Sequence, residues 1–149
     1  MPKKWPYPKP KNKAVTRSMK ANKPKDTGPE LLLRKELYHG GMRGYRANYA
    51  KAPGKPDICF VSRKLAIFVH GCFWHRCPIC TDKLPKHNRT FWKNKFTANI
   101  QRDRDKEEAL RKAGWRVLIY WECTVKKDRM PIVEEIREEY RNIKEGWKI

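Results

Sequence analysis

Residues 57–70 read Asp-Ile-Cys-Phe-Val-Ser-Arg-Lys-Leu-Ala-Ile-Phe-Val-His, the clearest strand signal in the chain. Residues 57–61 and 65–70 are rich in the apolar, β-branched and aromatic side chains that favour strands. The polar residues 62–64 between them are typical of a tight turn. The stretch therefore predicts a β-hairpin.

Helical patterns flank this hairpin on both sides. Before it, Thr27-Gly28-Pro29-Glu30 has the form of a capping box with proline in the first turn, and the helix that it opens is expected to end at Gly40-Gly41. After it, apolar side chains spaced four residues apart predict a long helix over residues 91–113. Pro131 marks the start of a last helix, which carries apolar residues on one face.

Two further strands are expected, over residues 45–49 and 115–121. The predicted order is helix, three strands, helix, strand, helix. That order indicates an α/β fold in which a small mixed β-sheet is flanked by helices.

The 149-residue chain is strongly basic, with a formal net charge of +20 at pH 7. Residues 1–101 carry 23 Lys and Arg against 5 Asp and Glu, whereas residues 102–149 carry 13 against 11. A positive field segregated in this way attracts polyanions, of which nucleic acid is the usual one. A merely solubilising lysine-rich surface is the alternative.

The first 25 residues form a distinct segment with nine Lys and Arg, five Pro and no acidic residue. With little to bury, they are expected to be a flexible basic arm that orders on a nucleic acid backbone. For residues 1–12, an inert solubilising tail explains the composition equally well. Residues 26–149 are predicted to form a single domain.

The chain also carries information on its compartment. No run approaches the ~18 apolar residues of a membrane span, and the N-terminus lacks the apolar segment of a signal peptide. We therefore expect a cytoplasmic location, where thiols stay reduced. Five cysteines in that compartment suggest metal binding before disulfides.

Four of the five cysteines have the spacing of metal ligands. Cys72, Cys77 and Cys80 are spaced C-x4-C-x2-C, and Cys123 follows 43 positions later. Tetrahedral zinc takes four such ligands, and the last often comes from a distant segment. The spacing predicts a structural zinc ion that ties an irregular loop to the sheet, with a coincidental pair of buried or reactive thiols as the alternative. Cys59 is interpreted as a packing residue.

A carboxylate and two imidazoles are expected near one end of the hairpin. Asp57 opens its first strand, His70 closes the second, and His75 follows five residues later. Together these side chains could bind Mg²⁺ and activate a water molecule. Taken alone, a Pro-Asp pair is also typical of a turn, and a histidine at a strand end is also typical of a surface.

Longer motifs connect these residues. The chain closely resembles the very-short-patch repair (Vsr) endonucleases from about Thr16 to Tyr140. The resemblance rests on rare residues in matching order and spacing, in the segments Thr16-Arg17-Ser18, Asp26-Thr27 with Glu30, Pro53-Gly54-Lys55-Pro56-Asp57, His70-Gly71-Cys72-Phe73-Trp74-His75, Phe91-Trp92, Asn99 with Arg102-Asp103, and residues 114–123.

This resemblance implies a fold related to type II restriction endonucleases and a Mg²⁺-dependent nick immediately 5′ of the thymine in a T·G mismatch. Asp57 would bind the Mg²⁺ with help from the backbone carbonyl of Val69. His75 would act as general base, and His70 would position or stabilise the scissile phosphate. Glu30 would support the site, although it could equally serve only to cap its own helix.

The resemblance also implies aromatic residues that enter the base stack beside the mismatch. Phe73, Trp74 and Trp92 match these positions, and Met19 aligns with a wedge residue of the N-terminal arm if a two-residue deletion after Ser18 is allowed. Stacking of an inserted ring is worth roughly 1–3 kcal/mol per base. The alternative is that the three rings form a small core around the cysteine loop.

Three functions follow from these patterns. The first is a monomeric nicking endonuclease whose partner is double-stranded DNA with a T·G mismatch. The second is a related nuclease of a mobile element or restriction system that cuts paired DNA. The third is a zinc-containing nucleic-acid-binding module without catalysis, which has no need for Asp57, His70 and His75 together.

The basic arm yields a first testable prediction. Deleting residues 1–15 removes five lysines, so the dependence of DNA affinity on salt concentration should become shallower, because fewer counterions are released on binding. Affinities measured between 50 and 200 mM salt (about the range over which release is largest) check this. An unchanged slope would mean that the arm does not touch phosphate.

Overall fold

The computed structural model describes residue 13 and residues 25–81 and 83–146. The basic arm expected over residues 1–25 and the wedge position Met19 fall almost wholly outside these residues. No helix among the described residues has the length and apolar character needed to cross a membrane. The elements follow one another in the order α2 (Gly28–His39), β1 (Arg46–Ala47), β2 (Ile58–Phe60), the 3-10 turn η1 (Val61–Arg63), β3 (Leu65–His70), α3 (Cys72–His75), α4 (Arg89–Lys112), β4 (Arg116–Trp121), α5 (Glu122–Lys127) and α6 (Met130–Gly146).

The predicted mixed sheet is confirmed. Its four strands lie in the order β1-β2-β3-β4, with β1, β2 and β3 antiparallel and β3 and β4 parallel. The hairpin of β2 and β3 turns at Lys64, which adopts the left-handed conformation at φ 50°. Between β3 and β4 the chain crosses over through α4, as parallel strands require.

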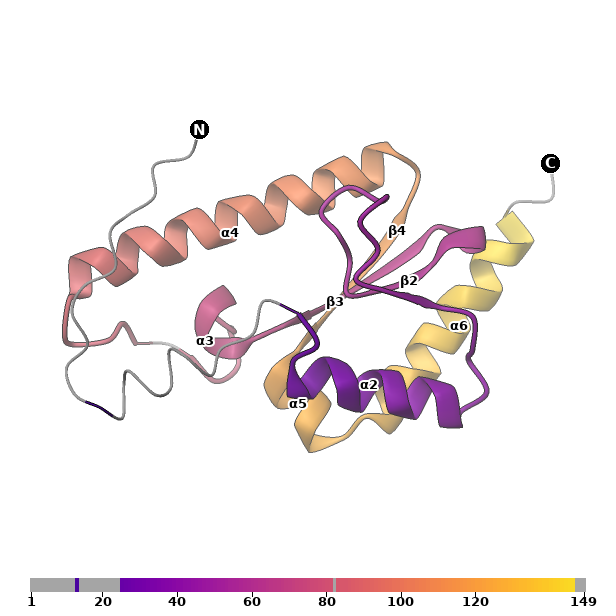
Figure 1. Ribbon diagram of the computed structural model, residues 1–149, viewed down its shortest axis with the longest axis horizontal. Coiled ribbons are helices and arrows are strands. Elements are labelled where there is room, and N and C mark those ends of the chain that lie inside the picture. Colours follow the sequence, from indigo (N-terminus) through magenta and orange to yellow (C-terminus); the bar gives the residue numbers. More distant parts are fainter. Residues whose placement is uncertain (1–12, 14–24, 82, 147–149) are drawn as a thin grey trace.

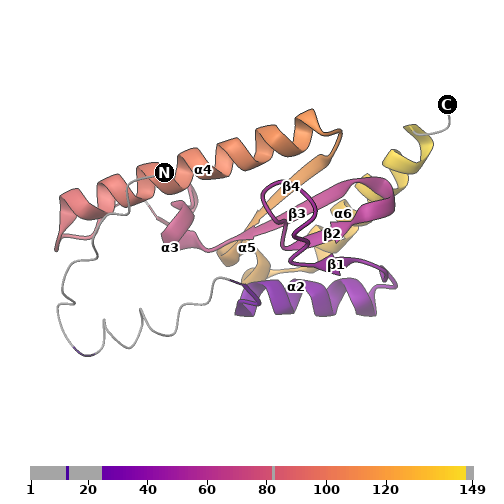
Figure 2. The same ribbon diagram turned by 45° about the horizontal axis from the view of Figure 1, so that its top comes forward.

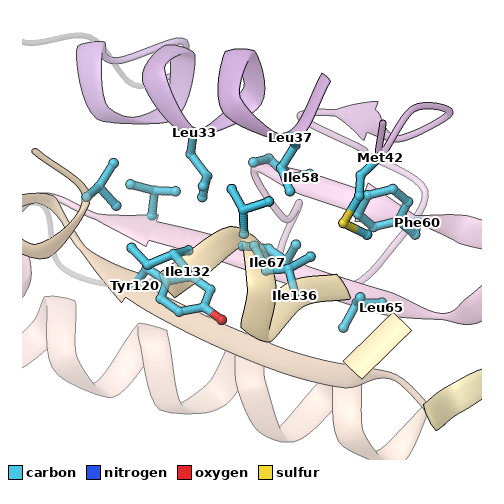
Figure 3. Packing of buried hydrophobic residues seen from close by; sticks show 13 residues of the cluster. Leu33, Leu37, Met42, Ile58, Phe60, Leu65, Ile67, Tyr120, Ile132 and Ile136 are labelled. Atoms are coloured by element: carbon cyan, nitrogen blue, oxygen red, sulfur yellow. The ribbon is translucent and has the colours of Figure 1, made fainter. Parts of the chain in front are cut away.

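Helices cover both faces of the sheet (Figures 1 and 2). On one face, α2, α5 and α6 pack over the larger core, whose inward side chains Figure 3 shows. On the other face, Leu110 of α4 packs on Cys59, Ala66 and Phe68. The N-terminal half of α4 extends beyond the sheet and lies against α3 (Figure 1).

Strand β3 is buried along its whole length, and its side chains alternate between the two faces. Ile67 and Val69 belong to the larger core, whereas Ala66 and Phe68 belong to the core under α4. The same alternation places His70 on the α4 side. A strand covered on both faces is typical of the centre of an α/β sheet.

Several boundaries differ from those expected. The strand predicted over residues 45–49 is only the two-residue β1, and β4 starts at Arg116. Two short helices, α3 and α5, were not predicted, because four- and six-residue helices carry too little periodicity to be recognised. Cys123 consequently lies in α5 and not at the end of a strand.

Helix α2 offers a matched pair of leucines for a stability test. Leu33 is fully buried in the larger core, whereas Leu31 is 50% exposed. We expect Leu33→Ala to lower the free energy of unfolding by about 2–5 kcal/mol. Leu31→Ala should change it by about 0.5 kcal/mol or less. Chemical denaturation measures both, and equal losses would contradict the position of α2 on the sheet.

Candidate active site and metal centre

The parallel pairing of β3 and β4 brings two distant segments to the same edge of the sheet. The register runs from Leu65 opposite Arg116 to His70 opposite Trp121. Both strands therefore end at the same level, and the chain continues into α3 from one and into α5 from the other. The residues just after the two strands become neighbours although about fifty positions separate them in sequence.

The first cluster at this edge consists of Cys72, Cys77, Cys80 and Cys123. Their four Sγ atoms lie within 4.8 Å of one another, so the group could hold a metal ion. The Sγ atoms of Cys77 and Cys123 are 3.7 Å apart. Four thiolates placed ~2.3 Å from a tetrahedral ion are ~3.8 Å from one another, whereas a disulfide joins sulfurs at ~2.05 Å. The spacing therefore fits a metal and not a crosslink.

Backbone amides support this cysteine cluster. The N–H of Ile79 donates to Cys77 Sγ at 3.4 Å, and the N–H of Cys123 donates to Cys72 Sγ at 3.3 Å. Such bonds stabilise the negative charge of thiolate ligands. The fifth cysteine, Cys59, is fully buried under α4, where burial raises the pKa of its thiol to about 12. It packs as an apolar residue, as the sequence predicts.

Asp57 lies just before β2 and is partly buried instead of facing solvent. Its Oδ2 accepts a hydrogen bond from the N–H of Val69 on the neighbouring strand at 2.8 Å. Burial, followed by the negative charge of Glu30, raises the pKa of the Asp57 carboxyl to about 7. Because the charge of Glu30 acts on the partly buried Asp57 carboxyl, a cation bound at Asp57 would relieve this repulsion.

Glu30 is almost fully buried at the start of α2. Its Oε2 accepts hydrogen bonds from the N–H of Asp26 at 2.9 Å and from Arg34 Nη2 at 3.2 Å. The predicted capping box is wrong. The Thr27 side chain makes no capping hydrogen bond, and the backbone amide that donates to Glu30 belongs to Asp26 and not to Thr27. The carboxylate thus holds the start of α2 in place while its charge also reaches Asp57.

The two histidines of the candidate site lie face to face. The rings of His70 and His75 stack at a centroid distance of 4.1 Å and an interplanar angle of 14°. Trp121 packs edge-on against His70 at 5.4 Å. Burial, and then the charge of His75, lowers the pKa of His70 to about 4. His70 is therefore neutral at pH 7.

Asp103 on α4 completes this group, although sequence reasoning gave it no role. Its Oδ2 lies 2.5 Å from Nδ1 of His75. One turn earlier, Asn99 donates to the backbone carbonyl of Trp74 at 3.0 Å and itself accepts a hydrogen bond from Arg102 at 2.8 Å. The spacing of Asn99 and Asp103 by four residues, which puts them on one face of a helix, was the signal that could have identified this support.

The ligand atoms of His70, His75 and Asp103 also lie within 4.8 Å of one another, so this second cluster could hold a metal. However, the His75–Asp103 separation is that of a hydrogen bond, and two atoms bonded to each other in this way are poorly placed to share an ion. The arrangement fits a base with an orienting carboxylate better. Asp57 belongs to neither of the two metal-competent groups found among the described residues.

An aromatic cluster, formed by Phe73, Trp74, Trp92 and Phe96, lies between α3 and α4. Phe73 contacts the other three rings edge-on at 5.1–5.3 Å, and Trp92 stacks on Phe96. Phe96 is buried, whereas Phe73 is 38% exposed. The rings therefore pack against one another and on the buried Phe96, and one edge of the cluster stays open to solvent.

The chain is similar in sequence to known DNA endonucleases. A family model described as DNA mismatch endonuclease Vsr matches residues 9–79. The type II nicking enzyme V.NaeI of Lentzea aerocolonigenes is 41% identical over 132 residues, which cover 85% of this chain and 78% of that enzyme. The DNA mismatch endonuclease Vsr of Escherichia coli (strain K12) is 37% identical over 111 residues, which cover 74% and 70%. The type II nicking enzyme V.NmeAIP of Neisseria meningitidis is 40% identical over 122 residues, which cover 82% and 86%.

The cysteine cluster yields a prediction that separates ligand from packing residues. Cys123→Ser should remove a tightly held metal ion and lower the melting temperature much more than Cys59→Ser, because only Cys123 belongs to the cluster. Elemental analysis and thermal unfolding of both variants measure this. A wild-type protein without bound metal, or equal losses in the two variants, would contradict the metal centre.

Proposed function

The chain belongs to the Vsr family of DNA mismatch endonucleases and is a DNA endonuclease, and from this premise we propose that it nicks one strand 5′ of the thymine in a T·G mismatch in a Mg²⁺-dependent reaction. The observation that supports the proposal most directly is the convergence of Asp57, His70 and His75 at the end of β3. The mixed sheet with helices on both faces is consistent with a restriction-endonuclease-like fold, which is part of the same proposal.

Asp57 and the backbone of Val69 would hold the catalytic Mg²⁺. In a strand, the N–H and the C=O of one residue point to the same side, so the Val69 carbonyl faces the side on which its N–H meets Asp57. A carboxylate and a carbonyl are hard oxygen donors, and Mg²⁺ prefers few of them together with waters and phosphate. When bound there, Mg²⁺ would polarise the phosphate and favour deprotonation of a water.

His75 would act as the general base, and the Asp103 contact defines how. An ionised carboxylate only accepts hydrogen bonds, so Nδ1 of His75 carries the proton in their 2.5 Å contact. That tautomer leaves Nε2 unprotonated and able to take a proton from the attacking water. Asp103 is therefore a positioning residue that fixes the tautomer and the ring.

His70 would position the phosphate as a neutral ring. Because its pKa is lowered to about 4, it contributes a hydrogen bond and not a charge. Its stack on His75 and its edge contact with Trp121 restrict its rotation. Glu30 would support Asp57 from α2, where its own hydrogen bonds already hold it.

The cysteine cluster would hold a structural Zn²⁺. Four thiolate ligands are typical of closed zinc sites, which leave no open position for catalysis. The ion would connect α3 to α5, and the loop after α3 has few apolar side chains of its own. It would thereby fix His75, which lies two residues from Cys77.

The open aromatic cluster supports mismatch recognition. Phe73 is exposed at its edge, and Trp74 and Trp92 lie against it. A mismatched step is easier to unstack than a paired one, and the inserted rings would recover part of that energy. In the proposal these rings enter the base stack, together with Met19 of the N-terminal arm. The protein would act on double-stranded DNA as a cytoplasmic monomer.

A second function of the same active centre is favoured by the relatives. Two of the three relatives described above are named type II nicking enzymes, so a nuclease of a restriction system that cuts paired DNA is the second candidate. The third hypothesis, a binding module without catalysis, is wrong for a member of this endonuclease family.

The catalytic assignments predict a separation of cleavage from binding. Asp57→Ala and His75→Ala should lose nicking while they keep nearly wild-type affinity for the T·G duplex, because both act at the scissile phosphate. Loss of the base alone should cost about 10²–10⁴-fold in rate. Single-turnover rates and affinities on one labelled duplex measure this, with the metal content of each variant checked.

Two contrasts sharpen that experiment. His70→Ala should fall between these variants and wild type, since a neutral ring only orients the phosphate. Phe73→Ala and Trp74→Ala should show the opposite pattern. They should lower the affinity for the T·G duplex more than they lower the nicking rate at saturating DNA. Should Asp57→Ala nick at the wild-type rate, the active centre is misplaced.

A further inference from the structure

One basic side chain next to the candidate active site has no role in the proposed mechanism. Lys106 lies on α4 three residues after Asp103 and seven after Asn99. At helical spacing, these three residues share one face of α4. Asn99 and Asp103 use that face to hold Trp74 and His75, so Lys106 extends the same face by one turn.

The position of the Lys106 side chain is fixed by a close approach to the loop before Asp57. A Cβ built on Gly54 would lie 2.8 Å from both Cβ and Cγ of Lys106 and 3.3 Å from Cδ. Only a glycine allows this contact, and Gly54 also adopts φ +72°, which other residues rarely do. The stem of Lys106 therefore lies across the turn that leads, three residues later, to Asp57.

The charge at the end of this stem reaches both sides of the active centre. Burial and the charge of Glu30 raise the pKa of Asp57, and the ammonium group of Lys106 acts in the opposite direction. Burial lowers the pKa of His70, and Lys106 adds to that effect. One cation thus lies near the group proposed for the metal and near the group proposed for the phosphate.

Neighbouring cations on the same helix have acidic partners. Arg111 pairs with Glu107, and Lys112 pairs with Glu108 at 2.9 Å. Lys106 takes part in no ion pair within residues 25–81 and 83–146. The acid one turn before it, Asp103, is engaged by His75. An exposed ammonium without a protein partner, held at the edge of a nuclease centre, is available to a phosphate oxygen.

We propose that Lys106 is a further catalytic residue, whose ammonium group binds a non-bridging oxygen of the phosphate held between Asp57 and His70 and stabilises its negative charge during cleavage. The inference rests on the proposed function, because it takes the phosphate to lie at those two residues. The contact with Gly54 holds the first three carbons of the Lys106 stem beside the loop before Asp57, so only the end of the side chain has to be ordered when DNA binds.

This role predicts two effects of opposite sign. A positive charge beside Asp57 opposes the binding of a second cation there, whereas the same charge favours a phosphate that gains negative charge. Removing the charge should therefore slow cleavage at saturating Mg²⁺ and at the same time lower the Mg²⁺ concentration that gives half the maximal rate. If Lys106 only supported the loop before Asp57, its replacement would slow cleavage and also weaken Mg²⁺ binding, so that the half-saturating Mg²⁺ concentration would rise.

The test uses the full chain and single-turnover nicking of a T·G duplex over a range of Mg²⁺ concentrations. Lys106→Met keeps the apolar stem over Gly54 and removes the charge, and Lys106→Arg restores a charge. Lys112→Met is the matched control, because it removes one charge from the same helix at a position away from the site. Melting temperatures are measured for all three variants.

We expect Lys106→Met to slow nicking by about 10- to 100-fold at saturating Mg²⁺ and to lower the half-saturating Mg²⁺ concentration roughly two- to five-fold. Lys106→Arg should recover most of the rate, and Lys112→Met should match wild type. The inference would be overturned if Lys106→Met nicked at the same rate as Lys112→Met. It would also be overturned if Lys106→Met needed more Mg²⁺ for half the maximal rate, melted at a lower temperature and was not rescued by Lys106→Arg.

The proposed function is tested separately by Asp57→Ala in the same assay. If Asp57→Ala is inactive while Lys106→Met resembles the control, only the role of Lys106 fails. If Asp57→Ala still nicks, the position of the active centre fails, and the inference about Lys106 fails with it.

Discussion

The parallel pairing of β3 with β4 is the contact on which the rest of the molecule depends. It joins β3, which is buried along its whole length, to the partly buried β4, in register from Leu65–Arg116 to His70–Trp121. Because both strands end at one level, α3 and α5 start side by side, and the four cysteines meet. The crossover that parallel strands need is α4, and this same helix delivers Asp103 to His75. One sheet contact therefore brings together both the cysteine cluster and the residues of the proposed active centre.

Charge then separates the roles of the residues in the proposed active centre. Arg34 pairs with Glu30, whereas the partly buried carboxyl of Asp57 has a pKa raised by burial and by the charge of Glu30, so a proton or a bound cation stabilises it. His70 is kept neutral by burial, and His75 is oriented by Asp103. The excess of basic residues before residue 102 provides the long-range attraction for DNA. In the proposed mechanism, acidic residues that bind a cation thus lie within a basic protein that acts on a polyanion.

The sequence allowed most of this architecture to be predicted, and the gaps have physical reasons. The hairpin, the α4 helix and the strand before Cys123 were predicted because each has enough apolar residues to show its period. Helices α3 and α5 were not predicted, since four and six residues are too few to show a helical period. The four cysteines and the histidines were recognised by spacing and family motifs. The role of Asp103 could not be predicted, because only the fold shows that α4 passes beside His75. The burial of Asp57 also required the fold, since it depends on Val69 of the next strand.

Mismatch-dependent nicking is tested by the cleavage of end-labelled duplexes that differ in one base pair, T·G or T·A, with and without Mg²⁺. We expect a single nick, immediately 5′ of the mismatched thymine, only in the T·G duplex and only with Mg²⁺, and an intact opposite strand. Equal nicking of the T·A duplex would contradict mismatch recognition and favour the restriction-system alternative. Nicking that persists without any divalent cation would contradict the role given to Asp57.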